Sequence, residues 1–369
     1  MNLKTQTLDR AILRCIRRYA EADRLSDNEF QDLALRIFSF QYEKNKYYRR
    51  FCEIERKTPK NIRGWKEIPA IPAEGFKEFF LTTFPVKKAV RLFRTSGTTG
   101  PSTGSGRGAH YFETLKLYDE AISPPFKKYL LPDRARMDLF FLTASPEELK
   151  DSSLSYMMGV VRKRFGISVK DRFYVQQGRI LFEKLIDDLS KAKAPVMLLA
   201  TAFSLKSFLD YLRENKRTIR LKAGSRLMET GGFKGRAKEI SKKALYREYE
   251  TFLGIPPSHC VSEYGMTELS SQCYDTTLYD VMRGDRRKSF KKGPAWMRTL
   301  VIDPATGKEA GAGKKGILRH FDLANRGSVM AVETGDLGRI VGEGFELLGR
   351  SPVAEARGCS LAYEALIRG

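Results

Sequence analysis

The chain has 369 residues, of which 42% are hydrophobic and 11% aromatic. That is enough for a large core in two or three domains or subdomains, and it excludes a chain disordered throughout. The formal net charge of +22 attracts anionic partners, whether nucleic acid, a small polyanion or an acidic protein. No nucleic-acid-binding motif accompanies this charge, so we rank nucleic-acid binding last of the three.

The N-terminal segment is predicted to be an amphipathic helix. No apolar run reaches the roughly 18 to 20 residues that cross a bilayer, and the first residues lack the apolar core of a signal peptide. Apolar side chains recur there at helical spacing: Leu8, Ile12, Cys15, Ile16 and Tyr19. We expect a core-facing helix of a cytoplasmic protein, and a helix on a membrane surface is the second choice. The scattered cysteines and histidines predict neither disulfides nor zinc.

The first third of the chain leads into an unusual loop. Residues 1–85 are predicted to be mainly helical, and a strand near residue 90 runs into FRTSGTTGPSTGSGRG at 93–108. The pattern after this segment is typical of a helix, which we expect Pro124 and Pro125 to interrupt. His110, just past the loop, is interpreted as a surface residue rather than a substrate contact.

The middle of the chain alternates between two patterns. Buried-strand runs such as DLFFLTA at 138–144 and PVMLLATA at 195–202 are each followed by helical periodicity. We place one helix over 203–215, with its cap near Ser204, and a long helix over 234–254. This alternation predicts an α/β architecture in which helices flank a mostly parallel sheet.

The texture changes after residue 293, where short strands are separated by Gly, Asp and Asn turns. We therefore expect a small β-rich subdomain over 293–350. It follows an N-terminal helical segment of the main domain at 1–85 and an α/β core at 86–292. Residues 351–369 are predicted to be a short tail that carries Cys359.

The loop at 93–108 supports two interpretations. It contains no GxxxxGK[ST] phosphate-binding motif and no lysine. Backbone N–H groups and hydroxyls in such a loop can still form a concave anion site. Composition alone leaves phosphate binding and a flexible surface linker equally favoured.

Two later segments favour phosphate binding: SEYGMTELS at 262–270 and VETGDLGRI at 332–340. In this order, TSGTTG, YGMTE and TGD resemble the adenylate-forming ligase superfamily of acyl-CoA synthetases, aryl ligases, nonribosomal adenylation domains and luciferase. Gly231 and Gly232 stand where that superfamily builds its adenine loop. The resemblance implies a large N-terminal ligase domain and a reaction in which a carboxylate attacks the α-phosphate of ATP and releases pyrophosphate.

The resemblance also implies roles for single residues, with ATP and Mg²⁺ as cofactors. The residues implied at the departing pyrophosphate are Thr95, Ser96, Gly97, Thr98, Thr99 and Gly100. Those implied at the adenosine are Gly231, Gly232 and Phe233 along the base, Tyr264 stacked on it beside Gly265, and Asp336 at the ribose. Those implied in catalysis are Thr267 at the α-phosphate, Glu268 as the Mg²⁺ ligand and Arg350 at the ribose or phosphate.

Each of these residues also has a plain structural interpretation. Tyr264 alone would be a core aromatic residue, Glu268 a turn cap and Asp336 a turn initiator. The three motifs together favour the adenylating interpretation.

One branch of the superfamily matches nearly the whole length. The segments ASPEELKDSSLSYM, ETGGFKGRAKEIS and LLGRSPVAEARGCSL resemble the acyl-protein synthetase family of bacterial bioluminescence. That family activates a long-chain fatty acid and carries the acyl group on a cysteine near the C-terminus before passing it to an acyl reductase partner. Cys359 matches that cysteine. A buried structural role is the alternative for Cys359, and it is the interpretation we favour for Cys260 and Cys273.

The sequence departs from the superfamily in two places. The usual lysine after TSGTTG is absent, and only a short tail follows Arg350, so we expect the C-terminal lid domain and its catalytic lysine to be truncated. Arg107, Lys234, Lys238 or a partner protein could supply the missing charge. A ligase that loads coenzyme A or a carrier protein with an acyl or aryl acid remains the alternative function.

Overall fold

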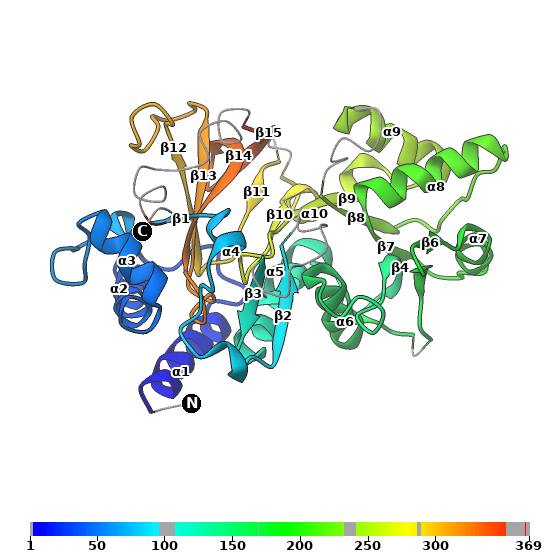
Figure 1. Ribbon diagram of the computed structural model, residues 1–369. Coiled ribbons are helices and arrows are strands. Elements are labelled where there is room, and N and C mark those ends of the chain that lie inside the picture. The colour runs from blue at the N-terminus through cyan, green and yellow to red at the C-terminus, as the bar shows by residue number, and fades with distance from the viewer. Residues whose placement is uncertain are drawn as a thin grey trace. The chain divides into compact units, whose positions relative to one another are not determined.

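The computed structural model describes residues 3–95, 108–168, 170–231, 241–285, 289–351 and 366 (Figure 1). The described helices are α1 Leu3–Arg18, α2 Asp27–Lys44, α3 Lys46–Ile54, α4 Gly75–Glu78, α5 Lys116–Leu130, α6 Ser153–Phe165, α7 Phe182–Ser190, α8 Ala202–Glu214, α9 Lys242–Leu253 and α10 Thr277–Met282. The described strands are β1 Ile71–Pro72, β2 Arg91–Arg94, β3 Ala109–Phe112, β4 Asp138–Ala144, β5 Phe173–Gln176, β6 Arg179–Ile180, β7 Val196–Thr201, β8 Arg226–Thr230, β9 Cys260–Tyr264, β10 Cys273–Asp275, β11 Lys291–Lys292, β12 Met297–Ile302, β13 Gly316–Asp322, β14 Ala331–Val341 and β15 Gly344–Arg350.

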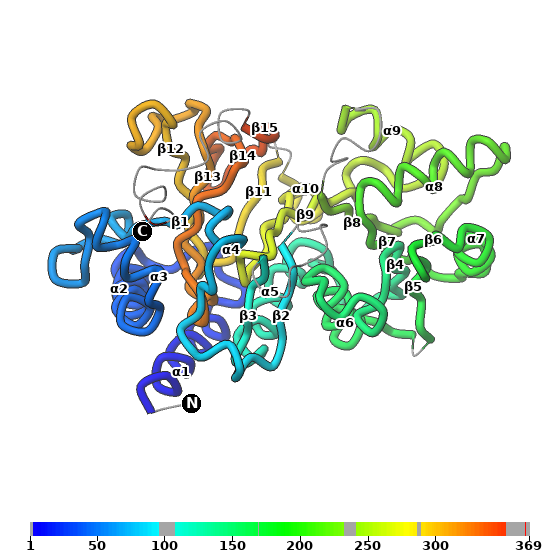
Figure 2. Tube along the Cα trace, viewed as in Figure 1, coloured from blue at the N-terminus to red at the C-terminus, as the bar shows by residue number. Residues whose placement is uncertain are grey.

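The chain forms two compact units. Unit 1 comprises Met1–Pro124, Met266–Gln272 and Lys292–Gly369, and unit 2 comprises Pro125–Gly265 and Cys273–Lys291. In unit 1 the N-terminal helices and the C-terminal strands, blue and orange in Figure 2, lie together. The four segments expected from the sequence stay a prediction.

Unit 2 contains the parallel sheet. Its strands follow the order β10-β9-β8-β7-β4-β5-β6, and the pairs from β9 to β5 are parallel. Apolar side chains on one face, among them Phe140, Leu142 and Leu198, form a buried core with residues of α7, α8 and α9. Figure 1 shows α8 and α9 on one side of these strands and α6 on the other. The predicted α/β architecture is confirmed.

Helix α8 begins with a capping box at the end of β7. The Thr201 side chain accepts a hydrogen bond from the Ser204 N–H at 3.1 Å, and the Ser204 hydroxyl accepts one from the Thr201 N–H at 3.2 Å. The cap is therefore Thr201, and the sequence prediction of Ser204 was three residues late. Ser204 is the return partner in the box.

Replacing Thr201 by Ala should lower the free energy of unfolding by about 1 kcal/mol, because it removes an N-cap acceptor. Urea denaturation measures this loss. Thr251→Ala is a matched control: this helical hydroxyl is exposed and donates only to the carbonyl of Arg247, so its effect should stay within about 0.5 kcal/mol. Equal losses in the two variants would contradict the role of Thr201 as a cap.

Two other predicted helices differ from the structure. Helix α5 runs through Pro124 and Pro125 without interruption, although both lack a donor N–H. The division between the two units falls between these two prolines. Helix α9 begins at Lys242, because the Ser241 side chain caps it by accepting from the N–H of Ala244 at 3.3 Å.

Unit 1 contains an antiparallel sheet in the order β12-β13-β14-β15, and β1 pairs in parallel with β14. The predicted β-rich segment is therefore a continuous sheet with the neighbouring N-terminal helices packed in the same unit. Helix α1 buries Leu8, Ile12, Cys15 and Ile16, so it faces the core as expected. None of the described helices is long and apolar enough to cross a membrane.

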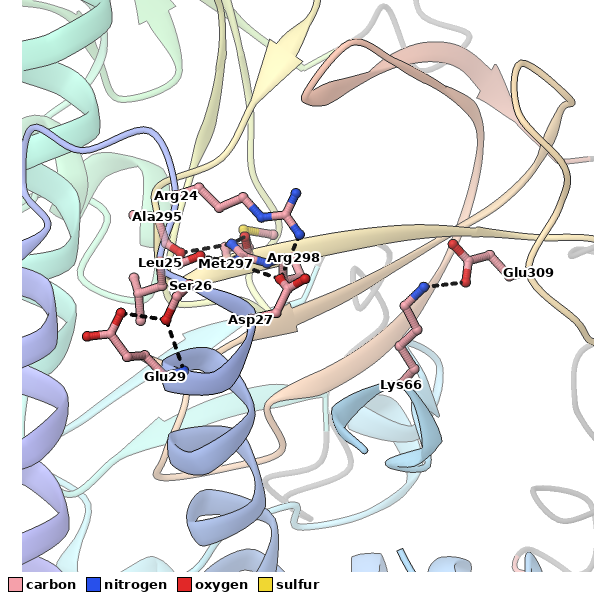
Figure 3. Close-up of polar contacts among 10 residues, drawn as sticks. All are labelled: Arg24, Leu25, Ser26, Asp27, Glu29, Lys66, Ala295, Met297, Arg298 and Glu309. Carbon is pink, nitrogen blue, oxygen red and sulfur yellow. Dashed lines mark hydrogen bonds and ion pairs between the residues drawn. The ribbon is translucent and has the colours of Figure 1, made fainter. Parts of the chain in front are cut away.

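Polar contacts tie the start of α2 to β12 (Figure 3). Ser26 caps α2 by accepting from the Glu29 N–H at 3.3 Å, and its hydroxyl donates to the Glu29 carboxylate at 2.7 Å. Arg298 of β12 donates to the carbonyl of Leu25 at 2.7 Å. Burial lowers the pKa of Arg298 to about 10, and this guanidinium remains charged at neutral pH. The contact fixes the helical N-terminal segment against the sheet.

Candidate functional site

The glycine-rich loop is closed at its base by a hairpin. Strands β2 and β3 pair antiparallel, with Arg94 opposite Ala109. Next to that pair, the N–H and the hydroxyl of Thr95 both donate to the carbonyl of Gly108, at 2.9 and 3.2 Å. The predicted strand before the loop is confirmed, but a second strand follows it where we expected helix. Ser96, Gly97, Thr98, Thr99 and Gly100 lie outside the described residues.

The hairpin base is bonded to the YGMTE motif. Nδ1 of His110, in β3, lies 2.7 Å from the carbonyl oxygen of Thr267. The Thr267 hydroxyl donates to the carbonyl of Arg94 at 3.2 Å, and that bond has to be released before the hydroxyl can donate to a phosphate. The structure thus brings the base of the hairpin and Thr267 of the second motif together within unit 1.

His110 is not the surface residue that we expected. It is only 1% exposed, and its ring packs on Phe112 and edge-on against Phe76. Burial lowers its pKa to about 4, which keeps the imidazole neutral at neutral pH. Because a carbonyl only accepts, Nδ1 must carry the proton.

Glu268 is a buried carboxyl group in the same unit. Desolvation raises its pKa to about 7, with Lys77 and Arg350 acting in the opposite direction. Its backbone carbonyl accepts a hydrogen bond of 2.8 Å from the side chain of Asn325. Burial thus makes ionisation of this group costly unless a cation is near.

Asp336 and Arg350 face one another on β14 and β15. They are opposite in the strand register, and Nε of Arg350 lies 3.1 Å from Oδ1 of Asp336. The Asp336 N–H donates to the Thr334 hydroxyl at 3.0 Å, which fixes the TGD segment within strand β14. The TGD and GR segments, 14 positions apart, thus form one pair, and Arg350 is close enough to Glu268 to affect its pKa.

The residues present fit a Mg²⁺ ion that arrives with a nucleotide. Among the described residues, no cluster of three or more His, Cys, Asp or Glu side chains could hold a metal on its own. Mg²⁺ in nucleotide sites is commonly held by one or two carboxylates together with phosphate oxygens. A single buried carboxyl with a raised pKa, Glu268, matches that requirement, because a cation would offset its desolvation.

The remaining motif residues lie in unit 2, at the carboxyl ends of the parallel strands. Thr230 of β8 is opposite Glu263 of β9, so Gly231 and Tyr264, which follow them, are at the same edge of the sheet. Gly231 has φ +73°, a conformation that favours glycine. Tyr264 is buried and Gly265 is exposed. Gly232 and Phe233 lie outside the described residues.

A network of buried charges at this edge was missed by the sequence analysis. Nζ of Lys291 bonds the carbonyl and hydroxyl of Ser262, both at 3.0 Å, and a carboxylate oxygen of Asp275 at 3.2 Å. Burial would raise the pKa of Asp275, but Lys291 and Lys242 lower it. The Thr230 hydroxyl donates to Glu263, whose pKa burial raises to about 7. This network fixes β9 just before Tyr264.

The cysteines divide into two groups. Cys15, Cys52, Cys260 and Cys273 are buried free thiols, and burial raises the pKa values of the first three. A thiol that resists ionisation is a poor nucleophile, in agreement with the structural role expected for Cys260. Cys359, Arg107, Lys234 and Lys238 lie outside the described residues.

Comparison with known proteins identifies relatives at two levels. The family model described as "Acyl-protein synthetase, LuxE" matches residues 14–367. No curated protein matches the chain.

Several solved structures of 2-hydroxyisobutyryl-CoA ligase share the fold. The structure in the postadenylation state with 2-HIB-AMP has a TM-score of 0.63 and 16% identity, over 88% of this chain and 67% of that chain. The structure with 2-HIB-AMP and CoA in the thioesterification state has a TM-score of 0.64 and 17% identity, over 88% and 68%. An open conformation with the same two ligands has a TM-score of 0.62 and 16% identity, over 88% and 74%. The chain thus has the adenylate-forming ligase fold that the sequence predicts.

Proposed function

Because the chain belongs to the LuxE family of acyl-protein synthetases and is therefore an AMP-forming ligase, we propose that it activates a long-chain fatty acid as its acyl-adenylate. We further propose that the acyl group then moves to the thiol of Cys359 and on to an acyl reductase or another accepting protein. The family assignment supports the adenylation of an acid and the transfer of its acyl group. The length of the acid, its final acceptor and the part played by Mg²⁺ belong to the proposal.

The observation that carries the proposal is the clustering in unit 1 of motifs far apart in sequence. The base of the glycine-rich loop is bonded to Thr267 through His110 and Arg94. Glu268 follows, and Arg350, paired with Asp336, affects its pKa. A turn cap or a core packing residue would not need these partners. Phosphate, metal and ribose contacts would need them close together.

In the proposed first step, an oxygen of the fatty acid carboxylate attacks the α-phosphorus of ATP. The bond from that phosphorus to the bridging oxygen breaks, and pyrophosphate leaves with the electron pair. Thr267 donates to the α-phosphate, and Asp336 accepts from the ribose hydroxyls. Glu268 would hold Mg²⁺, and the bound ion would supply positive charge at the phosphate oxygens. An anion that attacks a polyanion needs this neutralisation together with in-line orientation.

In the proposed second step, the Cys359 thiolate attacks the acyl carbonyl carbon. The carbon–oxygen bond to AMP breaks, so that AMP leaves and a thioester forms, while the thiol proton passes to solvent. A thioester remains reactive enough for onward transfer. The other four cysteines are poor candidates, since they are buried.

Labelled palmitate with ATP should acylate the wild-type chain, and Cys359→Ser should lose at least about 90% of the hydroxylamine-sensitive label while it still adenylates. Gel autoradiography measures the label, and pyrophosphate exchange measures adenylation. Cys15→Ala is the matched control and should keep both, since burial raises the pKa of Cys15 to about 12.

If Cys359→Ser kept the hydroxylamine-sensitive label, Cys359 would not be the acyl acceptor. Acyl transfer to added coenzyme A or a carrier protein, with no label on the chain, would instead favour the alternative ligase. The solved neighbours include structures with bound CoA, and the charge of +22 suits either acidic acceptor.

A further inference from the structure

We propose that His110 and Asn325 are positioning residues that hold the backbone of the YGMTE motif, an inference that rests on the proposed function. His110 donates to the Thr267 carbonyl at 2.7 Å, and Asn325 donates to the Glu268 carbonyl at 2.8 Å. The two side chains come from β3 and from the connection between β13 and β14. They therefore fix the backbone carbonyls of two successive residues, Thr267 and Glu268, whose side chains face the nucleotide in the proposed reaction.

A second pair of bonds holds the two serines that follow the motif closely, Ser270 and Ser271. Asp322, at the end of β13, accepts from the Ser270 N–H and the Ser271 hydroxyl, both at 2.8 Å. The indole N–H of Trp296 donates to the same Ser271 hydroxyl at 3.0 Å. The segment 267–271 is thus held at both ends by buried side chains of unit 1. Residues 266–272 themselves form only a short turn and bend with no helix or strand of their own.

The backbone around Asn325 is itself held by hydrogen bonds and an ion pair. The Gln41 side chain donates to the Asn325 carbonyl at 2.7 Å and accepts from the Met330 N–H at 3.1 Å. The next residue, Arg326, pairs with both oxygens of Asp9, at 2.7 and 2.9 Å. The connection between β13 and β14 is therefore fixed to α1 and α2, so the first 45 residues help to determine where Thr267 and Glu268 lie.

We call the hydrogen bonds from His110 and Asn325 to the carbonyls of Thr267 and Glu268 the clamp. Loss of one clamp bond should lower the rate of the reaction more than it lowers the stability of the chain. A misplacement of about 1 Å at reacting groups can cost about 10²-fold in rate. The stability lost with a buried hydrogen bond is only about 1–3 kcal/mol. Within unit 1, His110 contacts the Thr267 carbonyl and the rings of Phe76 and Phe112, so its loss should change turnover more than the affinity for ATP.

The test is His110→Leu, which keeps bulk and removes the donor. Hydrogen–deuterium exchange should show amides of 266–272 exchanging at least about tenfold faster, while β7 in unit 2 is unchanged. The kcat of pyrophosphate exchange should fall about 10–100-fold, with KM for ATP changed less than about threefold. His110→Asn, which places an amide N–H where Nδ1 stands, should restore at least part of both.

Two further variants keep the inference falsifiable. His320→Leu is the matched control: His320 is equally buried and lies in the same unit, and it contacts Thr299 and Phe345 of the antiparallel sheet. This variant should leave unchanged both the hydrogen–deuterium exchange of residues 266–272 and the kcat of pyrophosphate exchange. Asn325→Asp keeps the volume, removes the amide donor, and should reproduce the effects of His110→Leu.

The exchange measurement does not depend on any activity of the chain. Unchanged protection of 266–272 in His110→Leu and Asn325→Asp would overturn the clamp. If the wild type showed no pyrophosphate exchange but both variants still lost protection of 266–272, the positioning role of His110 and Asn325 would stand and the proposed function would be overturned. Equal losses of kcat in His110→Leu and His320→Leu would reduce His110 to an ordinary core residue.

Discussion

Glu268→Gln should reduce acid-dependent pyrophosphate exchange by about 10²–10³-fold, because it removes the carboxylate that would hold Mg²⁺, whose positive charge the transition state needs at the phosphates. The change preserves shape, and it also removes a buried acid whose pKa is raised to about 7. The folded protein should therefore be at least as stable as the wild type. The loss should appear in kcat, and the initial rate of label transfer into ATP measures it.

A matched control separates charge at the site from charge in general. Glu309→Gln removes an exposed carboxylate of unit 1 that pairs with Lys66 at 2.7 Å (Figure 3). Exchange by this variant should be unchanged, since surface pairs contribute about 0–1 kcal/mol. If Glu268→Gln retained more than about half of the wild-type rate, Glu268 would be a turn residue, and the proposed Mg²⁺ contact would be wrong.

Arg326→Leu should lower the free energy of unfolding by about 3–5 kcal/mol, because it leaves the Asp9 carboxylate buried without its partner. Arg326 is 2% exposed, and it also lies 3.5 Å from Glu113. Urea denaturation at neutral pH measures the loss. Arg36→Leu removes an exposed partner of Asp32 at 3.3 Å, and its effect should stay within about 0.5 kcal/mol.

The deficit of Arg326→Leu should shrink as the pH falls. Burial raises the pKa of Asp9 even in the wild type, where Arg326 opposes the rise, so removal of Arg326 should raise it further. A folded-state pKa above the unfolded value means that the native state binds the proton more readily, and stability then increases as pH falls. A deficit that grew on acidification would contradict this account of the pair.

The parts of the fold that the sequence predicts well are those in which one local signal dominates. DLFFLTA at 138–144 coincides with β4, because a short run with five apolar residues among seven predicts a buried strand in an alternating α/β pattern. Helix α5 shows the opposite case. Pro124 and Pro125 lie inside it, and tertiary packing of residues such as Ala121, Ile122 and Phe126, all 0% exposed, overrides the local preference.

The candidate site divides in the same way. Thr267, Glu268, Asp336 and Arg350 belong to short motifs, and the structure places them in one unit. His110, Asn325 and Lys291 carry no motif of their own. Each becomes meaningful only through contacts with residues far away in sequence, such as the bond from His110 to Thr267, 157 positions apart. Periodicity and composition report local structure, so they contain no signal for such pairs.

The most direct test of the proposed function is acid-dependent exchange of labelled pyrophosphate into ATP by the wild-type chain, with acids from acetate to palmitate and a set of aryl acids. We predict an exchange rate that increases with aliphatic chain length and is highest with long-chain fatty acids, since each buried methylene adds about 0.8 kcal/mol to the free energy of binding. Exchange confined to short or aryl acids would contradict a fatty-acid ligase. If none of the acids supported exchange under conditions in which ATP binds, adenylation by this chain acting alone would be contradicted.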